Sequence, residues 1–157
     1  MTNELKQEFT RRITKANKTE LIVILYDMLL QYILDSKSAV ELDNENQFKI
    51  EVRRARQCID ELIASLDLQY AIGVNLFQIY QFMKREFILV KFENPDILDH
   101  MEKITKELLF AYNEISRQDY SLPVMEHTET VYAGITYGKK SINENADYNA
   151  KTRGYLI

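Results

Sequence analysis

The strongest constraint on the fold is a regular run of apolar residues between about Gln47 and Leu68. Six of them are separated alternately by four and three positions: Phe48, Val52, Ala55, Ile59, Leu62 and Leu66. This spacing is typical of helices packed with a left-handed crossing, because it keeps one stripe of side chains facing a neighbouring helix. The segment is therefore predicted to be a helix that is buried along one side by other helices.

Three further segments have the composition of long helices: residues 18–42, a segment that starts between 70 and 74 and ends near 92, and residues 95–116. Asn17 is a good N-cap for the first of these, and Glu20 completes a capping box with it. Pro95 suits the first position of the last helix. The expected core residues of these three helices are Leu21, Leu25, Met28, Leu29, Tyr32 and Ala39, then Ile72, Leu76, Ile79, Met83, Phe87 and Val90, and finally Ile97, Met101, Ile104, Leu108, Ala111 or Tyr112, and Ile115.

Four helices joined by short connections predict an all-α fold, an antiparallel up-down four-helix bundle over residues 18–117. Residues 1–17 are predicted to be a short N-terminal segment, either a weak helix or a stretch lying on the bundle. Residues 118–157 are predicted to be a mostly non-helical C-terminal extension, because they contain a proline and three glycines and have no sustained helical stripe.

The composition excludes several classes of function. The net charge is -4, whereas nucleic-acid binders usually have a basic face. One cysteine permits no intramolecular disulfide, the N-terminus is too polar for a signal peptide, and no apolar run approaches the roughly 20 residues that insert into a membrane. Cys58, His100 and His127 are too scattered for a metal site or a catalytic pair. We therefore expect a cytoplasmic protein that has no metal or other cofactor and is not an enzyme.

Several large apolar residues fall outside the expected core stripes. A turn of 100° per residue places Val23, Leu30 and Leu34 opposite the core face of their helix, and Phe77 and Ile88 opposite that of theirs. An exposed side chain of this size forgoes about 1.5–3 kcal/mol relative to burial. The N-terminal segment, the C-terminal extension, a second copy or a client polypeptide could cover them, or an irregular bundle could bury them internally. The pattern is typical of a rigid bundle that binds an amphipathic partner in a groove.

Three blocks of this sequence resemble the FliS family of bacterial flagellin export chaperones. They are residues 16–21 (ANKTEL) with 25–27 (LYD), residues 55–67 ending in SLD, and Gly73, Asn75, Leu76, Tyr80 and Met83. The order and spacing of the blocks carry the resemblance over residues 9–116. Two features depart from the family pattern: Lys18 replaces a proline at the helix start, and the chain continues well beyond residue 117.

The resemblance implies a four-helix bundle of the bacterial cytoplasm that binds the C-terminal segment of flagellin. Such binding prevents premature polymerisation and keeps flagellin competent for export, without a cofactor or catalysis. Export-apparatus components are further candidate partners, and no nucleic acid is implied. The resemblance also implies that the chaperone's own N-terminal segment occupies part of the groove until flagellin displaces it.

Two sets of candidate binding residues follow from these observations. The client-binding set is Val23, Tyr26, Asp27, Leu30, Leu34, Phe77 and Ile88. The lid or self-docking set is Leu5, Phe9, Ile13, Val131, Tyr132, Ile135, Tyr137, Tyr155, Leu156 and Ile157. If the extension docks on its own bundle the protein is a monomer, and if it docks on a neighbour the protein is a homodimer. A self-associating structural or regulatory bundle that uses this extension is the alternative function.

Overall fold

The computed structural model describes residues 1–125, which form five α-helices and no β-strand. The helices are α1 (Asn3–Lys15), α2 (Lys18–Glu41), α3 (Glu45–Ala64), α4 (Ala71–Leu89) and α5 (Ile97–Ser116). The prediction of an all-helical fold is confirmed for this part of the chain. Four of the five helices lie in the predicted bundle, and the fifth, α1, lies in the N-terminal segment that was predicted to be either a weak helix or a stretch on the bundle surface. The expectation for residues 126–157 lies outside the described residues. Among the helices that are described, none is both long and apolar enough to cross a membrane.

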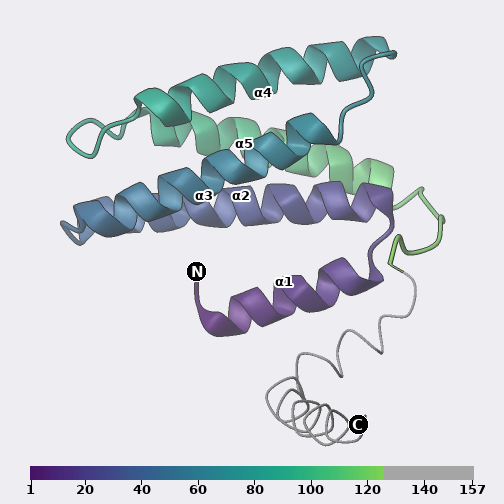
Figure 1. Cartoon of the computed structure of the whole chain (residues 1–157), viewed down its shortest axis with the longest axis horizontal. Helices are drawn as coiled ribbons and strands as arrows, with labels where there is room; N and C mark the ends of the chain where they lie inside the picture. Colours follow the sequence, from purple (N-terminus) through teal and green to yellow (C-terminus); the bar gives the residue numbers. More distant parts are fainter. Residues whose placement is uncertain (126–157) are drawn as a thin grey trace, which may run out of the picture. The chain divides into compact units, whose positions relative to one another are not determined.

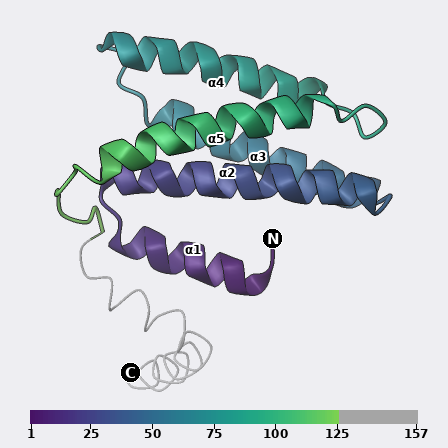
Figure 2. The ribbon, with the colours of Figure 1, turned by 180° about the vertical axis from the view of Figure 1, so that it is seen from behind.

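The helices are stacked, and consecutive helices run in opposite directions (Figures 1 and 2). Helix α2 is the most central, because α3 and α5 pack on it from one side and α1 packs on it from another. Helix α4 packs on α3. Both views show α4 and α5 close together at the connection between them and diverging toward the start of α4. The arrangement is therefore a bundle that is open along one seam.

The helix boundaries follow from local capping. The Asn17 side chain accepts the Glu20 N–H at 2.8 Å, and the Glu20 carboxylate accepts the Asn17 N–H at 2.8 Å, which confirms the predicted capping box. Helix α2 ends in a Schellman motif, with Asn44 N–H donated to the Ala39 carbonyl at 2.8 Å and Asp43 in the left-handed region at φ 52°. The Asn44 side chain then caps α3. Helix α3 therefore begins as soon as α2 has ended.

The core confirms the predicted seam of α3 and corrects that of α2. Phe48, Ala55, Ile59 and Leu62 of α3 are buried. On α2 the completely buried large side chains are Tyr26, Leu29 and Ile33, whereas Leu21, Leu25, Met28 and Tyr32 are only partly buried. Leu29 and Ala39 of the expected face are buried as predicted, whereas the rest of the buried face differs because α2 contacts three helices and is apolar on more than one side.

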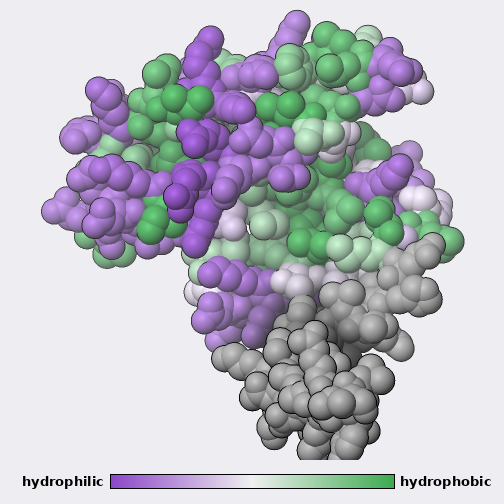
Figure 3. Space-filling view, viewed as in Figure 1, coloured by the Kyte–Doolittle hydropathy of each residue, from purple (hydrophilic) through white to green (hydrophobic). Residues whose placement is uncertain are grey.

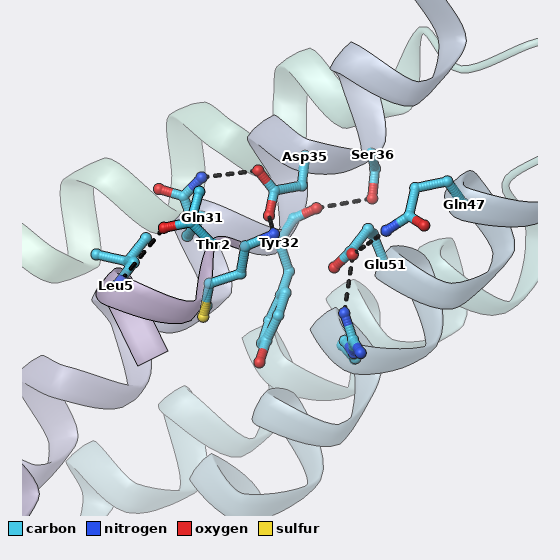
Figure 4. Close-up of polar contacts among 10 residues, drawn as sticks. Thr2, Leu5, Gln31, Tyr32, Asp35, Ser36, Gln47 and Glu51 are labelled. Atoms are coloured by element: carbon cyan, nitrogen blue, oxygen red, sulfur yellow. Dashed lines mark hydrogen bonds and ion pairs between the residues drawn. The ribbon is translucent and has the colours of Figure 1, made fainter. Parts of the chain in front are cut away.

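A buried carboxylate lies between α2 and α3. Glu51 of α3 is completely buried, and its Oε1 accepts hydrogen bonds from Gln47 and, at 2.9 Å, from Arg54 (Figure 4). The Arg54 guanidinium in turn lies 5.9 Å from the centre of the Tyr32 ring on α2. A buried charge has to keep its partners, because leaving it unpaired costs several kcal/mol, of order 3–5. This set of contacts therefore favours one alignment of α3 against α2.

The connection between α3 and α4 requires a glycine. A Cβ on Gly73 would overlap the backbone carbonyl of Asp67 and would lie 2.9 Å from its carbon atom. The Asp67 side chain also accepts the Gln69 N–H at 2.9 Å, which shapes the turn. The two residues belong to separate blocks of the sequence, and the close approach of their backbones sets where α4 begins.

Candidate functional site

An apolar cleft of about 660 Å³ lies between α4 and α5. Its lining residues are Asn75, Gln78, Ile79 and Phe82 on α4, and Ile104, Glu107 and Leu108 on α5. At one end the Phe82 ring contacts His100 of α5 edge-on, with centroids 6.1 Å apart. The cleft is therefore bounded where α4 and α5 come together and widens where they diverge.

Both walls of the cleft continue along their helices toward the open end. Ile72 lies two turns before Ile79 on the same face of α4, and it is 66 % exposed. On α5, Ile115 lies three turns beyond Ile104 in nearly the same direction and is 54 % exposed. We call this surface, from Ile72 and Ile115 to Phe82 and Ile104, the α4–α5 groove.

Exposed apolar surface of this kind is unusual on a protein without a partner. Seen from the side of Figure 1, hydrophobic side chains gather on the right, around the recess beneath α4, and in a second group at the upper left, while hydrophilic side chains cover most of the lower left (Figure 3). The start of α4 and the end of α5 lie on the right in that view. One of the two groups of apolar side chains on this face therefore lies at the open end of the bundle.

A second apolar surface, on α2, is covered by α1. Phe9, Ala16 and Ile24 are buried there, and Leu5, Ile13, Leu21 and Met28 pack around them. The stripe predicted from the four-residue repeat at Leu5, Phe9 and Ile13 is therefore the face that α1 presents to α2. Since α1 packs on no other helix as extensively, it is an appendage to the bundle rather than part of its core.

One ion pair fastens α1 to α2. Arg12 donates a hydrogen bond to Asp27 at 2.5 Å, and its guanidinium lies 5.6 Å from the centre of the Phe9 ring. Both partners are only partly exposed. A cleft of about 350 Å³ beside this pair is lined by residues of α1, α2 and α5, with Val23 at its base. The Asp27 of the LYD block therefore contacts α1.

The predicted client-binding residues lie in different environments. Tyr26 is completely buried in the core between α2, α4 and α5, and Val23 is buried beside residues of α1. Leu30 and Phe77 are half-buried, while Leu34 and Ile88 are exposed. Val23, Leu30 and Leu34 share one face of α2, as predicted. Their role in binding stays a prediction, and the tail residues Val131, Tyr132, Ile135, Tyr137, Tyr155, Leu156 and Ile157 lie outside the described residues.

Three tyrosines meet in the interior behind the α4–α5 groove. The hydroxyl groups of Tyr26 and Tyr80 share a hydrogen bond, and the Tyr112 ring lies 5.3 Å from that of Tyr26. Burial is the main cause that raises the pKa of all three hydroxyl groups above the ordinary value of tyrosine. The two tyrosines of the LYD and third sequence blocks therefore act together in joining α2 to α4.

An ionic cluster holds α5 against α2 near the closed end of the groove. Lys37 of α2 contacts Asp99 at 2.6 Å and Glu102 at 2.7 Å. Hydrogen bonds to these carboxylates, Asp99 first, raise the pKa of Lys37, while Lys106 and then Lys37 lower the pKa of Glu102. The cluster holds α5, one wall of the groove, against α2. The other wall, α4, packs on α3 instead.

Cys58 and His100 are the cysteine and histidine among residues 1–125, and they lie in different environments. Cys58 is buried, and burial raises the pKa of its thiol to about 12, so the nucleophilic thiolate is scarce at neutral pH. His100 is exposed and stacks on Phe82. Within residues 1–125, no group of three or more His, Cys, Asp or Glu side chains is placed to hold a metal ion.

Sequence reasoning missed the α4–α5 groove because it assigned the groove residues to the core. Ile72, Ile79, Ile104, Leu108 and Ile115 were all expected in core stripes, yet Ile72, Ile79 and Ile115 are exposed. On α5 the buried stripe is Leu98, Met101 and Thr105, one residue away from the expected one at its start. The only signal in the sequence was that α4 carries more apolar residues than one buried face needs.

The fold presents an open apolar groove and a second apolar face covered by α1, and these features are typical of the class of helical proteins that bind an amphipathic partner in a groove. The family model described as flagellar protein FliS matches residues 1–119, so the chain belongs to the FliS family of flagellar export chaperones. The members of this family are chaperones for flagellin rather than enzymes. A comparison with curated proteins finds no match to this chain.

Proposed function

We propose that this protein binds the C-terminal segment of flagellin in the bacterial cytoplasm, prevents its premature polymerisation and keeps it competent for export. The segment binds as an amphipathic helix along the α4–α5 groove. Membership of the FliS family supports the choice of partner. The geometry of the groove supports the mode of binding.

The observation that carries the proposal is the continuity of the two apolar walls. Ile79 on α4 and Leu108 on α5 line the same open cleft, and exposed Ile72 and Ile115 continue the two apolar stripes beyond it, one helical repeat further along each helix. The splayed pair α4 and α5 supplies two sides of a three-helix contact, and a client helix supplies the third. Burying one large aliphatic side chain yields about 1.5–3 kcal/mol, so four such side chains provide enough free energy to offset part of the cost of ordering a flexible segment.

Helix α1 serves as the lid in this proposal. Residues 1–17 are the lid, residues 18–117 the bundle, and residues 118–157 the extension. The lid packs through one narrow apolar stripe, Leu5, Phe9 and Ile13, and is also held to α2 by ion pairs from Arg12 to Asp27 and from the Met1 amino group to Asp35. The contact between α1 and α2 is still small compared with those among α2, α3 and α5. The client wraps over the bundle, so that a part of it beyond the groove-bound helix covers the face of α2 beneath α1 and replaces these contacts with its own. We propose that the protein is a monomer when α1 covers α2 and when the client replaces it.

Calorimetric titration with a flagellin C-terminal peptide tests the groove. Ile72→Asp and Ile115→Asp each place a charge on one wall at a position more than half exposed in the free protein. We expect each variant to weaken peptide binding by about 10- to 100-fold, which corresponds to the loss of one buried aliphatic side chain. The parent protein should show a clearly negative heat-capacity change on binding.

The matched control is Ile88→Asp on the same helix. Ile88 is 56 % exposed and lies about 160° around α4 from Ile72, away from the groove. Peptide affinity should be unchanged in this variant. If Ile88→Asp weakens peptide binding and the groove variants do not, the client does not bind in the α4–α5 groove. It then binds on the face of α4 that carries Phe77 and Ile88, as the helical spacing in the sequence predicts. If the parent protein binds no peptide at high micromolar concentration, the proposed function itself is rejected.

A further inference from the structure

The hinge on which α1 must turn is buried. Helices α1 and α2 are joined by Ala16 and Asn17 alone, and each of these residues is only 3 % exposed. Both have extended backbones, with ψ angles of 139° and 179°. Because the helices on either side are rigid, α1 can leave α2 only if the dihedral angles of these two residues change. A hinge is usually exposed, so the segment that buries this one also restrains it.

Residues 119–124, which follow α5, cover the hinge; we call them the hinge strap. Val124 donates its N–H to the Ala16 carbonyl at 3.0 Å. The Asn17 side-chain amide donates to the Asp119 carbonyl at 3.1 Å and lies 3.4 Å from the Ser121 carbonyl. Asn17 therefore uses its oxygen to cap α2 and its nitrogen to hold the hinge strap.

The hinge strap is anchored on α5 and is internally ordered. The Asp119 N–H is donated to the Ser116 carbonyl at 3.2 Å, which continues the last turn of α5. The Asp119 carboxylate accepts hydrogen bonds from the Ser121 N–H at 3.0 Å and from the Thr19 hydroxyl on α2. These bonds, that from Ser121 first, hold the pKa of Asp119 below its ordinary value. The end of α5 and the start of α2 are thus joined through one ionised side chain.

We propose that the hinge strap regulates access to the client surface on α2, because α1 cannot open unless the contacts of the strap with Ala16 and Asn17 are released. The proposal rests on the proposed function only in treating α1 as a lid over that surface. The family match ends at residue 119, so nearly all of the hinge strap lies beyond the matched residues. The strap forms the first part of the extension, so in the sequence the restraint on the lid lies between α5 and residues 126–157.

Hydrogen–deuterium exchange on the full chain without any client tests this coupling. The double variant Asp119→Ala/Val124→Pro removes the carboxylate that binds Thr19 and the N–H that binds Ala16. We expect amide exchange in α1 to become about tenfold faster, because local opening no longer has to break these hydrogen bonds. Exchange in α3 should be unchanged. Tyr120→Ala is the matched control, since this side chain of the same segment is exposed, and it should change neither helix.

The exchange rates in α1 and α3 together decide whether the hinge strap restrains α1. If exchange in α1 is unchanged in the double variant, the hinge strap does not restrain the lid. If α1 and α3 accelerate together, the variant has lowered global stability and the coupling to the hinge is also refuted. Titration with the flagellin C-terminal peptide then separates the two proposals. Faster exchange in α1 with tighter peptide binding supports both, whereas faster exchange with unchanged affinity supports the strap and refutes the role of α1 as a lid.

Discussion

Replacement of Gly73 by alanine should destabilise the protein because of one backbone contact. An added Cβ would overlap the Asp67 carbonyl oxygen and lie 2.9 Å from the carbonyl carbon, whereas ordinary contact begins near 3.4 Å. The neighbour is backbone and cannot rotate away as a side chain could. Overpacking of this kind costs about 1–3 kcal/mol, and we take the upper end because the turn must shift as a whole.

The helix propensity of alanine offsets part of this cost. Alanine is favoured over glycine by about 1 kcal/mol in a helix interior. The expected net effect of Gly73→Ala is therefore a decrease of about 2 kcal/mol in the free energy of unfolding, measured by urea denaturation with an unchanged m-value. That is a large part of the stability of a domain of this size, which is about 5–15 kcal/mol.

A pair of control variants at Gln81, which is exposed on α4, measures the propensity term separately. The difference between Gln81→Ala and Gln81→Gly should be about 1 kcal/mol. If Gly73→Ala is as stable as the parent protein or more stable, the turn adapts without cost. The close approach of residues 67 and 73 then does not determine the position of α4.

Three further predictions concern buried hydroxyl groups and one strained turn. Tyr80→Phe leaves the buried Tyr26 hydroxyl without this partner and should lower the free energy of unfolding by about 1–3 kcal/mol. Adding Tyr26→Phe to this variant should cost less than a second loss of that size. Urea denaturation of the parent protein, the two single variants and the double variant measures the coupling between the two hydroxyl groups. Burial raises the pKa of Tyr26 and Tyr80, so the two neutral hydroxyl groups stabilise the folded protein fully below about pH 10, and this stabilisation is lost as the pH rises above it. An ultraviolet titration of tyrosinate should show that both groups ionise only when the protein unfolds. Early ionisation of all tyrosines would contradict this prediction. Asp43→Gly should raise the free energy of unfolding by about 0.5–1 kcal/mol, because φ 52° strains a residue with a Cβ, and thermal denaturation would detect an opposite sign.

The helices could be predicted from the sequence where local signals agreed. The capping box at Asn17 and Glu20 gave the start of α2, and the alternating spacing from Phe48 to Leu62 gave the buried face of α3. Both signals depend on residues within one or two turns. They are therefore independent of how the helices are later assembled.

The binding surface could not be predicted in the same way, because it depends on the separation of two helices. Ile79 and Leu108 have the spacing of core residues, and they would be core residues if α4 packed closely on α5. A helical period identifies an apolar face but not the helix that covers it. Tyr26 shows the same dependence on assembly, because its place in the LYD block does not reveal that its hydroxyl group meets that of Tyr80 in the interior.

The groove and the lid are connected through the last turn of α5. Ile115 lies on the wall of the α4–α5 groove, and only four residues later Asp119 holds the hinge strap against α2. The intervening backbone is hydrogen-bonded, since Asp119 donates its N–H to Ser116, so the two sites share one rigid element. A client helix that packs on Ile115 contacts the last turn of α5, which also anchors the hinge strap. Conversely, release of the hinge strap leaves that turn of α5 with fewer contacts. The same turn of helix therefore borders the groove and anchors the strap at the α1–α2 hinge, which is why substitutions at Ile115 and at Asp119 should not be additive in their effect on client affinity.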